Sequence, residues 1–328
     1  MLQRYRLFAP ICFALLLLLG SNQAHAQRRW RVNNTPGVNA DFTTIQAAHD
    51  AATTGDIIYV EGSFTAYGDV TFTKRITLIG TGYFLSENSG VTATTLQATM
   101  GSITLNTGSA GSVIKGCSFF IVTINDVGNL TISRNNMSGV RNNSAVITDP
   151  INIIQNYIGG NSIALGGSLA NLFIGNNFIE GSISLSQTTT AVINNNTIQG
   201  SITVTNSTLA NNIMTNTGTF SQTGSSWSNN LGSGTQFGTA NGNQNNVIMA
   251  NVFVGATGNS TDGKWRLRPG SPAIGAGTGG VDCGMFGGGT PYVLSGITNI
   301  PTITNFSTTA TGNNTTPLNV TISTQSNR

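Results

Sequence analysis

The chain has 328 residues, with 14 Lys or Arg, 11 Asp or Glu and a formal net charge of +3. Only 8% of the residues are charged, and they form no basic stripe of the kind that nucleic-acid-binding proteins carry, which argues against a nucleic-acid partner. A composition of this kind, with 41 Gly, is also found in disordered chains, but the regular apolar alternation described below argues against disorder.

Residues 1–26 have the pattern of a secretory signal peptide. A basic start precedes an apolar run at 7–19, and a small-x-small cleavage site ends at Ala26. The run is shorter than the ~20 residues that a transmembrane helix needs. We therefore predict cleavage between Ala26 and Gln27 and a mature chain without a transmembrane segment. The expected location is extracellular, at the cell surface or in the periplasm.

Residues 27–56 are predicted to form an N-terminal cap. Apolar residues at helical spacing predict a short helix at about 42–53, with Asp41 as its N-cap and Gly55 at its end. The helix would cover the open end of a solenoid, where strand edges are otherwise unpaired. His49, the one His after the predicted cleavage site, is expected on the solvated side of this helix.

Residues 57–289 are predicted to form a parallel β-helix. The region 129–216 repeats one short phrase, in which Asn precedes a large apolar residue by two places and an alternating strand pattern follows. Stacked coils would bury a column of Ile, Val and Leu, and stacked Asn amides can hydrogen-bond along it. The alternative is a β-sandwich with Asn-rich turns. The repeats place the expected Asn column at Asn135, Asn156, Asn177, Asn196 and Asn211.

The pattern weakens after residue 216. The Gly- and Ser-rich stretch 219–247 is either a set of loose coils or a long lateral loop, and KWRLRPGSPAIGAG, which begins at Lys264, is expected to close the solenoid. Residues 290–328 form a tail with two candidate strands, at 303–308 and 318–324. The tail either packs along the solenoid or forms a separate attachment segment.

Several phrases resemble a known family. FTTIQAAHDAATTGDIIYVEGSF (42–64) and KRITLIGTG (74–82) resemble the start of secreted right-handed parallel β-helix proteins of the pectin-lyase-like superfamily. The end phrases 265–288 and 291–303 are similar to those of bacterial members without assigned activity. The resemblance implies an all-β, single-stranded, right-handed parallel β-helix and a last coil near residue 265. It carries over no catalytic residue, because no lyase or hydrolase signature of the superfamily is visible.

Few residues in the central coils can carry chemistry. Asp126 and Asp149 fall near the same turn of adjacent coils, where two carboxylates could help to hold Ca²⁺. Arg134 or Arg141 would then serve as the base of a lyase. The simpler interpretation of both Asp residues is solvated turn positions, so we name no resident cofactor.

The aromatic and Cys residues leave further alternatives. Trp227 lies in a polar stretch and is the better candidate for an exposed sugar-stacking platform, whereas Trp265 lies in an apparent strand and is expected in the core. Tyr83 and Tyr292 are weaker stacking candidates. Cys117 and Cys283 could pair in an oxidising compartment, but the apolar strand pattern around Cys117 favours a small buried side chain. These two Cys lie in regions far apart in the chain, at 117 and 283.

We therefore expect a secreted or surface-displayed, non-catalytic β-helix with a structural, adhesive or glycan-binding role. Its expected partner is a polysaccharide or cell-surface glycan. The alternative is a polysaccharide lyase or glycoside hydrolase that acts on an extracellular polysaccharide, with a sparse site around Asp126 and Asp149. An ice- or mineral-binding face would need a flat Thr ladder, and the mixed Ser, Thr and Ala of the strands do not favour one.

Overall fold

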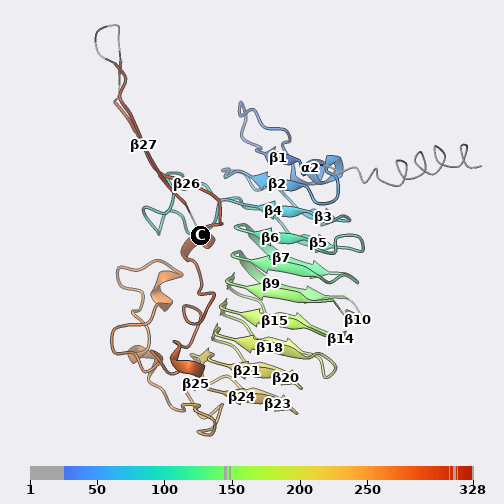
Figure 1. The fold of residues 1–328 in the computed structure, drawn as a ribbon, viewed down its shortest axis with the longest axis vertical. Coiled ribbons are helices and arrows are strands. Elements are labelled where there is room, and N and C mark those ends of the chain that lie inside the picture. The colour runs from blue at the N-terminus through green and yellow to red at the C-terminus, as the bar shows by residue number, and fades with distance from the viewer. Residues whose placement is uncertain are drawn as a thin grey trace, which may run out of the picture.

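A computed structural model describes residues 26–143, 146–147, 149–309, 311–312, 315 and 317–326. The predicted signal peptide therefore lies, apart from Ala26, outside the described residues. The chain forms a parallel β-solenoid of about nine turns (Figure 1). This confirms the predicted fold class and rejects the β-sandwich. Within the described residues, no helix is both long enough and apolar enough to cross a bilayer.

One long sheet, sheet A, supplies one strand to each coil. Its ten parallel strands follow the order of the chain, and apolar side chains such as Ile132, Ile153 and Ile174 align on its inner face. The strands are β1 (Arg29–Val32), β2 (Ile57–Val60), β4 (Thr77–Ile79), β6 (Val113–Lys115), β8 (Leu130–Ser133), β11 (Ile151–Ile154), β15 (Leu172–Gly175), β18 (Ala191–Asn194), β21 (Thr208–Ala210) and β24 (Ser226–Ser228).

A second sheet of 13 strands, sheet B, forms the other walls. Its first strands are β3 (Val70–Phe72), β5 (Ile103–Leu105), β7 (Ser118–Ile124) and β9 (Asn136–Asn142). Beyond β9 the sheet divides into two arms. The short arm is β12 (Tyr157–Ile158), β16 (Phe178–Ile179), β19 (Thr197–Ile198), β22 (Ile213–Met214) and β25 (Leu231–Gly232); the long arm is β13 (Ile163–Leu165), β17 (Ile183–Leu185), β20 (Ile202–Thr205) and β23 (Phe220–Thr223). A small pair, β10 (Val146–Ile147) and β14 (Ser168–Leu169), lies apart from both.

A buried column of Asn side chains fixes the bend between sheet A and the short arm. After the first member, each amide oxygen accepts from the backbone N–H and the amide of the Asn one coil earlier, as Asn177 Oδ1 does from Asn156 N and Nδ2 at 2.9 and 3.0 Å. The column is longer than expected, and its fifth member is Asn212 rather than Asn211. Its members are Asn135, Asn156, Asn177, Asn196, Asn212, Asn230 and Asn243. The stretch 219–247 therefore forms coils as far as residue 244, and not a lateral loop.

The N-terminal cap contains the one α-helix found among the described residues, α2 (Ile45–Ala51), within the expected range. Its N-cap is Thr44, whose hydroxyl accepts from Ala47 N at 3.2 Å, and not Asp41, which instead accepts from Arg31 N. The expected solvation of His49 is wrong, because the ring is buried and stacks on Phe72.

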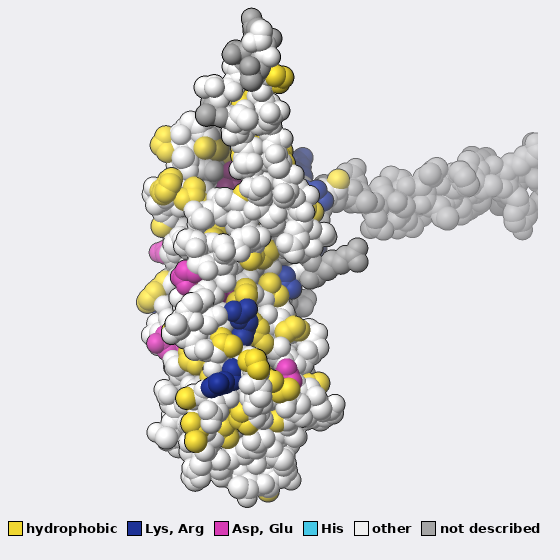
Figure 2. Space-filling view, turned by 90° about the vertical axis from the view of Figure 1, so that its left-hand side faces the viewer, with side chains coloured by type: hydrophobic (Ala, Val, Ile, Leu, Met, Phe, Trp, Pro, Cys, Tyr) yellow, Lys and Arg dark blue, Asp and Glu magenta, His cyan; other side chains and the backbone are white. Residues whose placement is uncertain are grey.

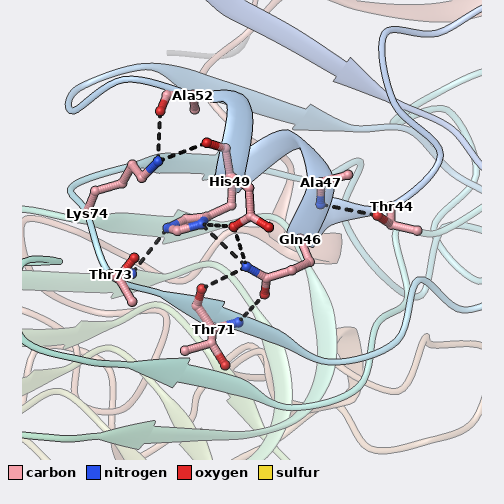
Figure 3. A network of polar contacts seen from close by, with 9 residues as sticks. Thr44, Gln46, Ala47, His49, Ala52, Thr71, Thr73 and Lys74 are labelled. Atoms are coloured by element: carbon pink, nitrogen blue, oxygen red, sulfur yellow. Dashed lines mark hydrogen bonds and ion pairs between the residues drawn. The ribbon is translucent and has the colours of Figure 1, made fainter.

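The contacts around His49 keep its imidazole ring neutral, with Nε2 as a hydrogen-bond acceptor. Thr73 N donates to Nε2 at 3.2 Å, so the ring proton lies on Nδ1, which is 3.1 Å from an oxygen of Asp50. Burial lowers the pKa of His49, and the hydrogen bond to Asp50 opposes this only in part. Gln46 joins the same network by bonding both backbone groups of Thr71 (Figure 3). The helix is thus pinned to β3 by polar contacts as well as by its apolar face.

Residues 245–301, here called the return segment, do not form the expected last coils. They fold back along the outside of the short arm, towards the N-terminal end (Figure 1). The predicted boundary at residue 289 is thus corrected to about 244, where Gln244 bridges to Leu231. The segment contains four 3-10 turns, namely η1 (Met249–Asn251), η2 (Gly263–Trp265), η3 (Thr278–Gly280) and η4 (Leu294–Gly296).

The return segment is held by a second column of polar side chains. The residue before each Asn of the buried column has a left-handed backbone, as at Gln155, Asn176 and Asn195 (φ 57°, 55° and 56°), so its side chain points outward. Asn176 Nδ2 donates to Gly287 O at 2.7 Å, and Asn195 Nδ2 donates to Asp282 O at 2.9 Å. Each Asn pair in the sequence thus serves two purposes, one inside the coil and one outside.

The last described part is a two-stranded antiparallel hairpin, β26 (Thr302–Thr308) and β27 (Val320–Gln325). These are the two strands expected in the tail. The hairpin projects away from the solenoid beyond its N-terminal end (Figure 1).

Candidate functional site

The four charged residues singled out from the sequence do not gather into one site. Asp126 and Asp149 are exposed and lie in the same turn of adjacent coils, before β8 and β11, but Asp149 stacks over Gly128 rather than over Asp126. Arg134 lies at the opposite end of β8, half-buried, and donates to Gln155 Oε1 and Ile297 O. Arg141 lies on the outer face of β9 and donates to Thr123 Oγ1 at 3.0 Å.

No group of three or more His, Cys, Asp or Glu in the described ranges could hold a metal ion. Arg134 is committed to fastening the return segment, because Asn299 Oδ1 is a further acceptor of its guanidinium. The arrangement of these residues therefore does not assemble the lyase site for which they were considered.

The two Trp residues differ from the expectations: both are partly buried, and it is Trp265 that lines an open cleft. Trp227, the predicted platform, is only partly exposed and closes the C-terminal end of the interior. Its ring packs against Phe220, and its Nε1 donates to Phe237 O at 2.8 Å. Trp265 lies in η2 rather than in a strand, and it lines an open cleft.

Two other expectations about aromatic and Cys residues are settled by burial. Tyr83 and Tyr292 are buried, and their hydroxyls are 2.7 Å apart, so neither offers a face to a sugar. Cys117 and Cys283 are both buried and unpaired, as the apolar pattern around Cys117 favoured. Burial raises the pKa of Cys283 to about 12, which keeps the thiol protonated.

The cleft lies between the return segment and the coils and has a volume of about 790 Å³. A turn of the segment forms it: Val254 N donates to Arg266 O and Arg268 N donates to Val252 O, which folds 252–268 back on itself. From the coils, Gln199 reaches the cleft at the end of β19. The lining is Gln199, Met249, Ala250, Phe253, Val254, Gly255, Ala256, Lys264, Trp265, Arg268 and Pro269.

The aromatic side of the cleft is rigid. Trp265 stacks on Phe178, an outward-facing residue of the short arm, with ring centroids 4.7 Å apart and planes at 28°. Phe253 meets the Trp265 ring edge-on at 5.2 Å. Phe178 stacks in turn on Tyr157 at 4.5 Å, so an aromatic row outside the coils supports the indole. Ring pairs of this geometry stabilise beyond simple area burial.

The polar side of the cleft is cationic. Lys264 Nζ lies 5.3 Å from the centroid of the Trp265 ring, a cation–π distance, and Arg268 Nη1 donates to Ala250 O at 3.0 Å. No Asp or Glu lines the cleft, and neither cation forms an ion pair with a carboxylate in the described part of the chain. Figure 2 shows Lys and Arg side chains among hydrophobic ones on the side of the molecule that carries the return segment.

The neighbouring outer wall of the long arm is uncharged. In-register outward positions form a row of small side chains, at Ala164, Ser184, Thr203 and Ser221, and all four are exposed. A second row of hydroxyls is tied between coils, since Ser201 N donates to Ser182 Oγ at 3.1 Å. Gln199 lies at the corner where the cleft meets this wall. The cleft was invisible in the sequence because 249–269, which supplies all of its lining except Gln199, follows no repeat, and its packing against the coils is a tertiary contact.

Comparison of the chain with protein-family models, with curated proteins and with solved structures finds no match. The fold and the geometry of the cleft therefore carry the functional argument.

Proposed function

We propose that this chain is an exported, non-catalytic β-helix that binds acidic glycans through the cleft at Trp265. The observation that supports it most directly is the pairing of a rigid aromatic wall with two cations and no lining carboxylate. Sugar rings stack their C–H faces on aromatic side chains, and ammonium and guanidinium groups bind carboxylates or sulfates by charge-assisted hydrogen bonds. A uronate or a sulfated sugar presents both features in one residue.

Two features support a polymeric ligand. The cleft opens at the corner of an uncharged wall of small side chains, mostly Ser and Thr, whose hydroxyls offer donors and acceptors to an extended chain. The predicted signal peptide and the resemblance to the pectin-lyase-like superfamily agree with a location where such polymers occur. We therefore also propose that the chain is exported and that it belongs to the pectin-lyase-like superfamily.

The test is binding to a panel of polysaccharides by titration calorimetry. We expect saturable binding to polygalacturonate, alginate or a sulfated galactan, no binding to neutral dextran, and weaker binding at 0.5 M salt than at ~0.1 M, because salt screens exposed charges. The variant K264A/R268A should bind at least tenfold more weakly, since a hydrogen bond to a charged group contributes ~1.5–3 kcal/mol.

Arg266→Ala is the matched control. Arg266 carries the same charge and lies between the two cations in sequence, but it is exposed, does not line the cleft and donates to Asn259 Oδ1 at 2.8 Å. If the control weakens binding as much as K264A/R268A, net charge and not the cleft is responsible, and the assignment of the site fails.

The same samples test the enzymatic alternative. Polymer length is followed with and without added Ca²⁺ for the wild type and for D126A/D149A. Depolymerisation that this variant abolishes would establish a lyase or hydrolase and overturn the non-catalytic proposal.

A further inference from the structure

The C-terminal hairpin exposes an apolar face that the described part of the chain does not cover. The cross-strand register places Phe306 opposite Ile322 and Thr308 opposite Val320, so these four side chains share one face of the hairpin. Leu318 continues the same face by its two-residue spacing. Phe306, Leu318, Val320 and Ile322 have exposed fractions of 57, 52, 49 and 55%. The opposite face carries polar side chains, such as the cross-strand pair Asn305 and Ser323.

Two further features of the hairpin are unusual for a free surface element. A two-stranded hairpin is only marginally stable alone in water, and it normally needs a third strand or a packing partner. Exposed strand edges are normally protected by charged side chains, but the sequence has no Lys, Arg, Asp, Glu or His between Asp282 and Arg328. The hairpin therefore lacks the charged residues that usually protect an exposed strand edge.

The apolar surface continues at the base of the hairpin. A groove of about 740 Å³ lies between the outer face of sheet A and the start of β26, and its apolar lining includes Tyr59, Ile79, Ile300 and Phe306. The charged residues of the groove, Arg31 and Glu61, neutralise each other in an ion pair. Phe306 thus belongs both to the groove and to the exposed face.

The apolar area of the hairpin face limits the kind of partner that can cover it. Half-exposed side chains of this size supply roughly 400 Å² of apolar surface per copy, so two faces in contact remove roughly 800 Å² from water, whereas stable interfaces bury about 1,200–2,000 Å². The groove at the base supplies additional apolar surface next to the same face. A partner without charges suits this hairpin, because the hairpin offers no charge for a complementary partner to recognise.

We propose that the occupant is a second copy of this chain, whose hairpin packs on this one, apolar face to apolar face, with the grooves at their bases included in the interface. The contact is isologous, since the same patch serves on both copies, and it closes as a dimer. The two hairpins together form a four-stranded, two-layer unit, which removes the instability of a lone hairpin. The dimer joins two solenoids through their C-terminal hairpins and would present two glycan clefts to one polymer.

The test is sedimentation velocity of the full chain over about 1–100 µM. We expect a concentration-dependent dimer. The variant F306N/I322T, which makes the apolar face polar, should raise the dissociation constant at least tenfold. The control N305S/S323N exchanges the polar cross-strand pair on the other face and should leave the constant within about twofold.

Disulfide trapping provides a test that leaves the apolar side chains in place. T308C lies on the apolar face and should form an interchain disulfide under mild oxidation, whereas S307C, on the other face, should not; Cys117 and Cys283 are buried. A monomer at every concentration, a dimer that survives F306N/I322T, or equal trapping at both positions would overturn the proposal. Binding of a monomer to phosphatidylcholine vesicles would also overturn it and would assign the face to lipid. None of these outcomes depends on glycan binding.

Discussion

Replacing Asn177 with Ala tests whether the buried Asn column stabilises the solenoid. Asn177 is fully buried, and its side chain makes four hydrogen bonds across three coils. Its Oδ1 accepts from Asn156 N and Asn156 Nδ2, at 2.9 and 3.0 Å. Its Nδ2 donates to Ile153 O at 2.8 Å and to Asn196 Oδ1 at 3.0 Å.

The cost follows from the groups that the substitution leaves behind. Asn156 N–H loses its acceptor in a buried site, at ~1–3 kcal/mol, and Asn156 Nδ2, Ile153 O and Asn196 Oδ1 each lose one of their bonds, at ~1 kcal/mol each. The free energy of unfolding should therefore fall by about 4–6 kcal/mol, before any cavity term. A hydrophobic substitution cannot restore the bonds, because the unsatisfied groups include backbone groups of the neighbouring coils.

The assay is urea unfolding followed by circular dichroism, combined with amide hydrogen exchange of peptides from the coils at 150–200. Exchange reports the local free energy of opening even when a solenoid unfolds in parts. Asn161→Ala is the control, since Asn161 is exposed in the turn between β12 and β13, one coil earlier. If Asn177→Ala lowers the free energy of unfolding by less than ~1 kcal/mol, or by no more than the control does, the hydrogen bonds of the column do not stabilise the coils.

Three further predictions follow from named contacts. Burial lowers the pKa of His49 below its unfolded-state value of 6.5. The contribution of the neutral ring to folding stability is therefore complete above pH 6.5 and is lost as the pH falls below it. The decrease in melting temperature from pH 7.5 to 5.5 should be smaller in His49→Gln than in the wild type. Gly200→Ala should destabilise by more than ~2 kcal/mol in urea unfolding, because its Cβ would lie 2.3 Å from Gly181 O, whereas Gly289→Ala, with open space around it, should be nearly neutral. Arg134→Ala should speed proteolysis and amide exchange of 290–301 and leave the coils protected, because it removes the bond to Ile297 O at 2.9 Å.

Each of these predictions has a clear contrary result. Identical pH profiles for wild type and His49→Gln would show that other groups govern acid sensitivity. Equal stability of the two Gly variants would mean that the coils separate easily at Gly200. Uniform loss of protection after Arg134→Ala would mean that the return segment and the coils open together.

The coils could be predicted from the sequence because their signal is local and repeated. Each coil needs an apolar inward column and an Asn at the bend, and both recur at a spacing near 20 residues. The prediction of the Asn column was wrong at one member, Asn211, because the sequence there has two adjacent Asn and either fits the spacing. The left-handed backbone of Asn211 (φ 60°) turns its side chain outward, where Oδ1 accepts from Thr278 N at 2.9 Å.

The return segment could not be predicted because it has no period of its own. Its order is imposed by the outward side chains of coils that precede it by about 70–160 residues, such as Asn211 for Thr278 and Arg134 for Ile297. The same reason explains why Trp265, and not Trp227, lines a cleft. A polar neighbourhood in the sequence suggested exposure for Trp227, but its ring faces the end of the apolar interior.

By itself, the sequence determined the parallel solenoid, the capping helix, the buried Asn column and the scarcity of charge on the coils. These follow from side-chain period and composition, which act between residues that are close in sequence or one repeat apart. Only the tertiary structure decided where the chain goes after the last coil, and hence the Trp265 cleft, the burial of His49 and the uncovered hairpin. Each of these depends on contacts between distant, non-repeating segments, and no local pattern encodes which surfaces such segments will meet.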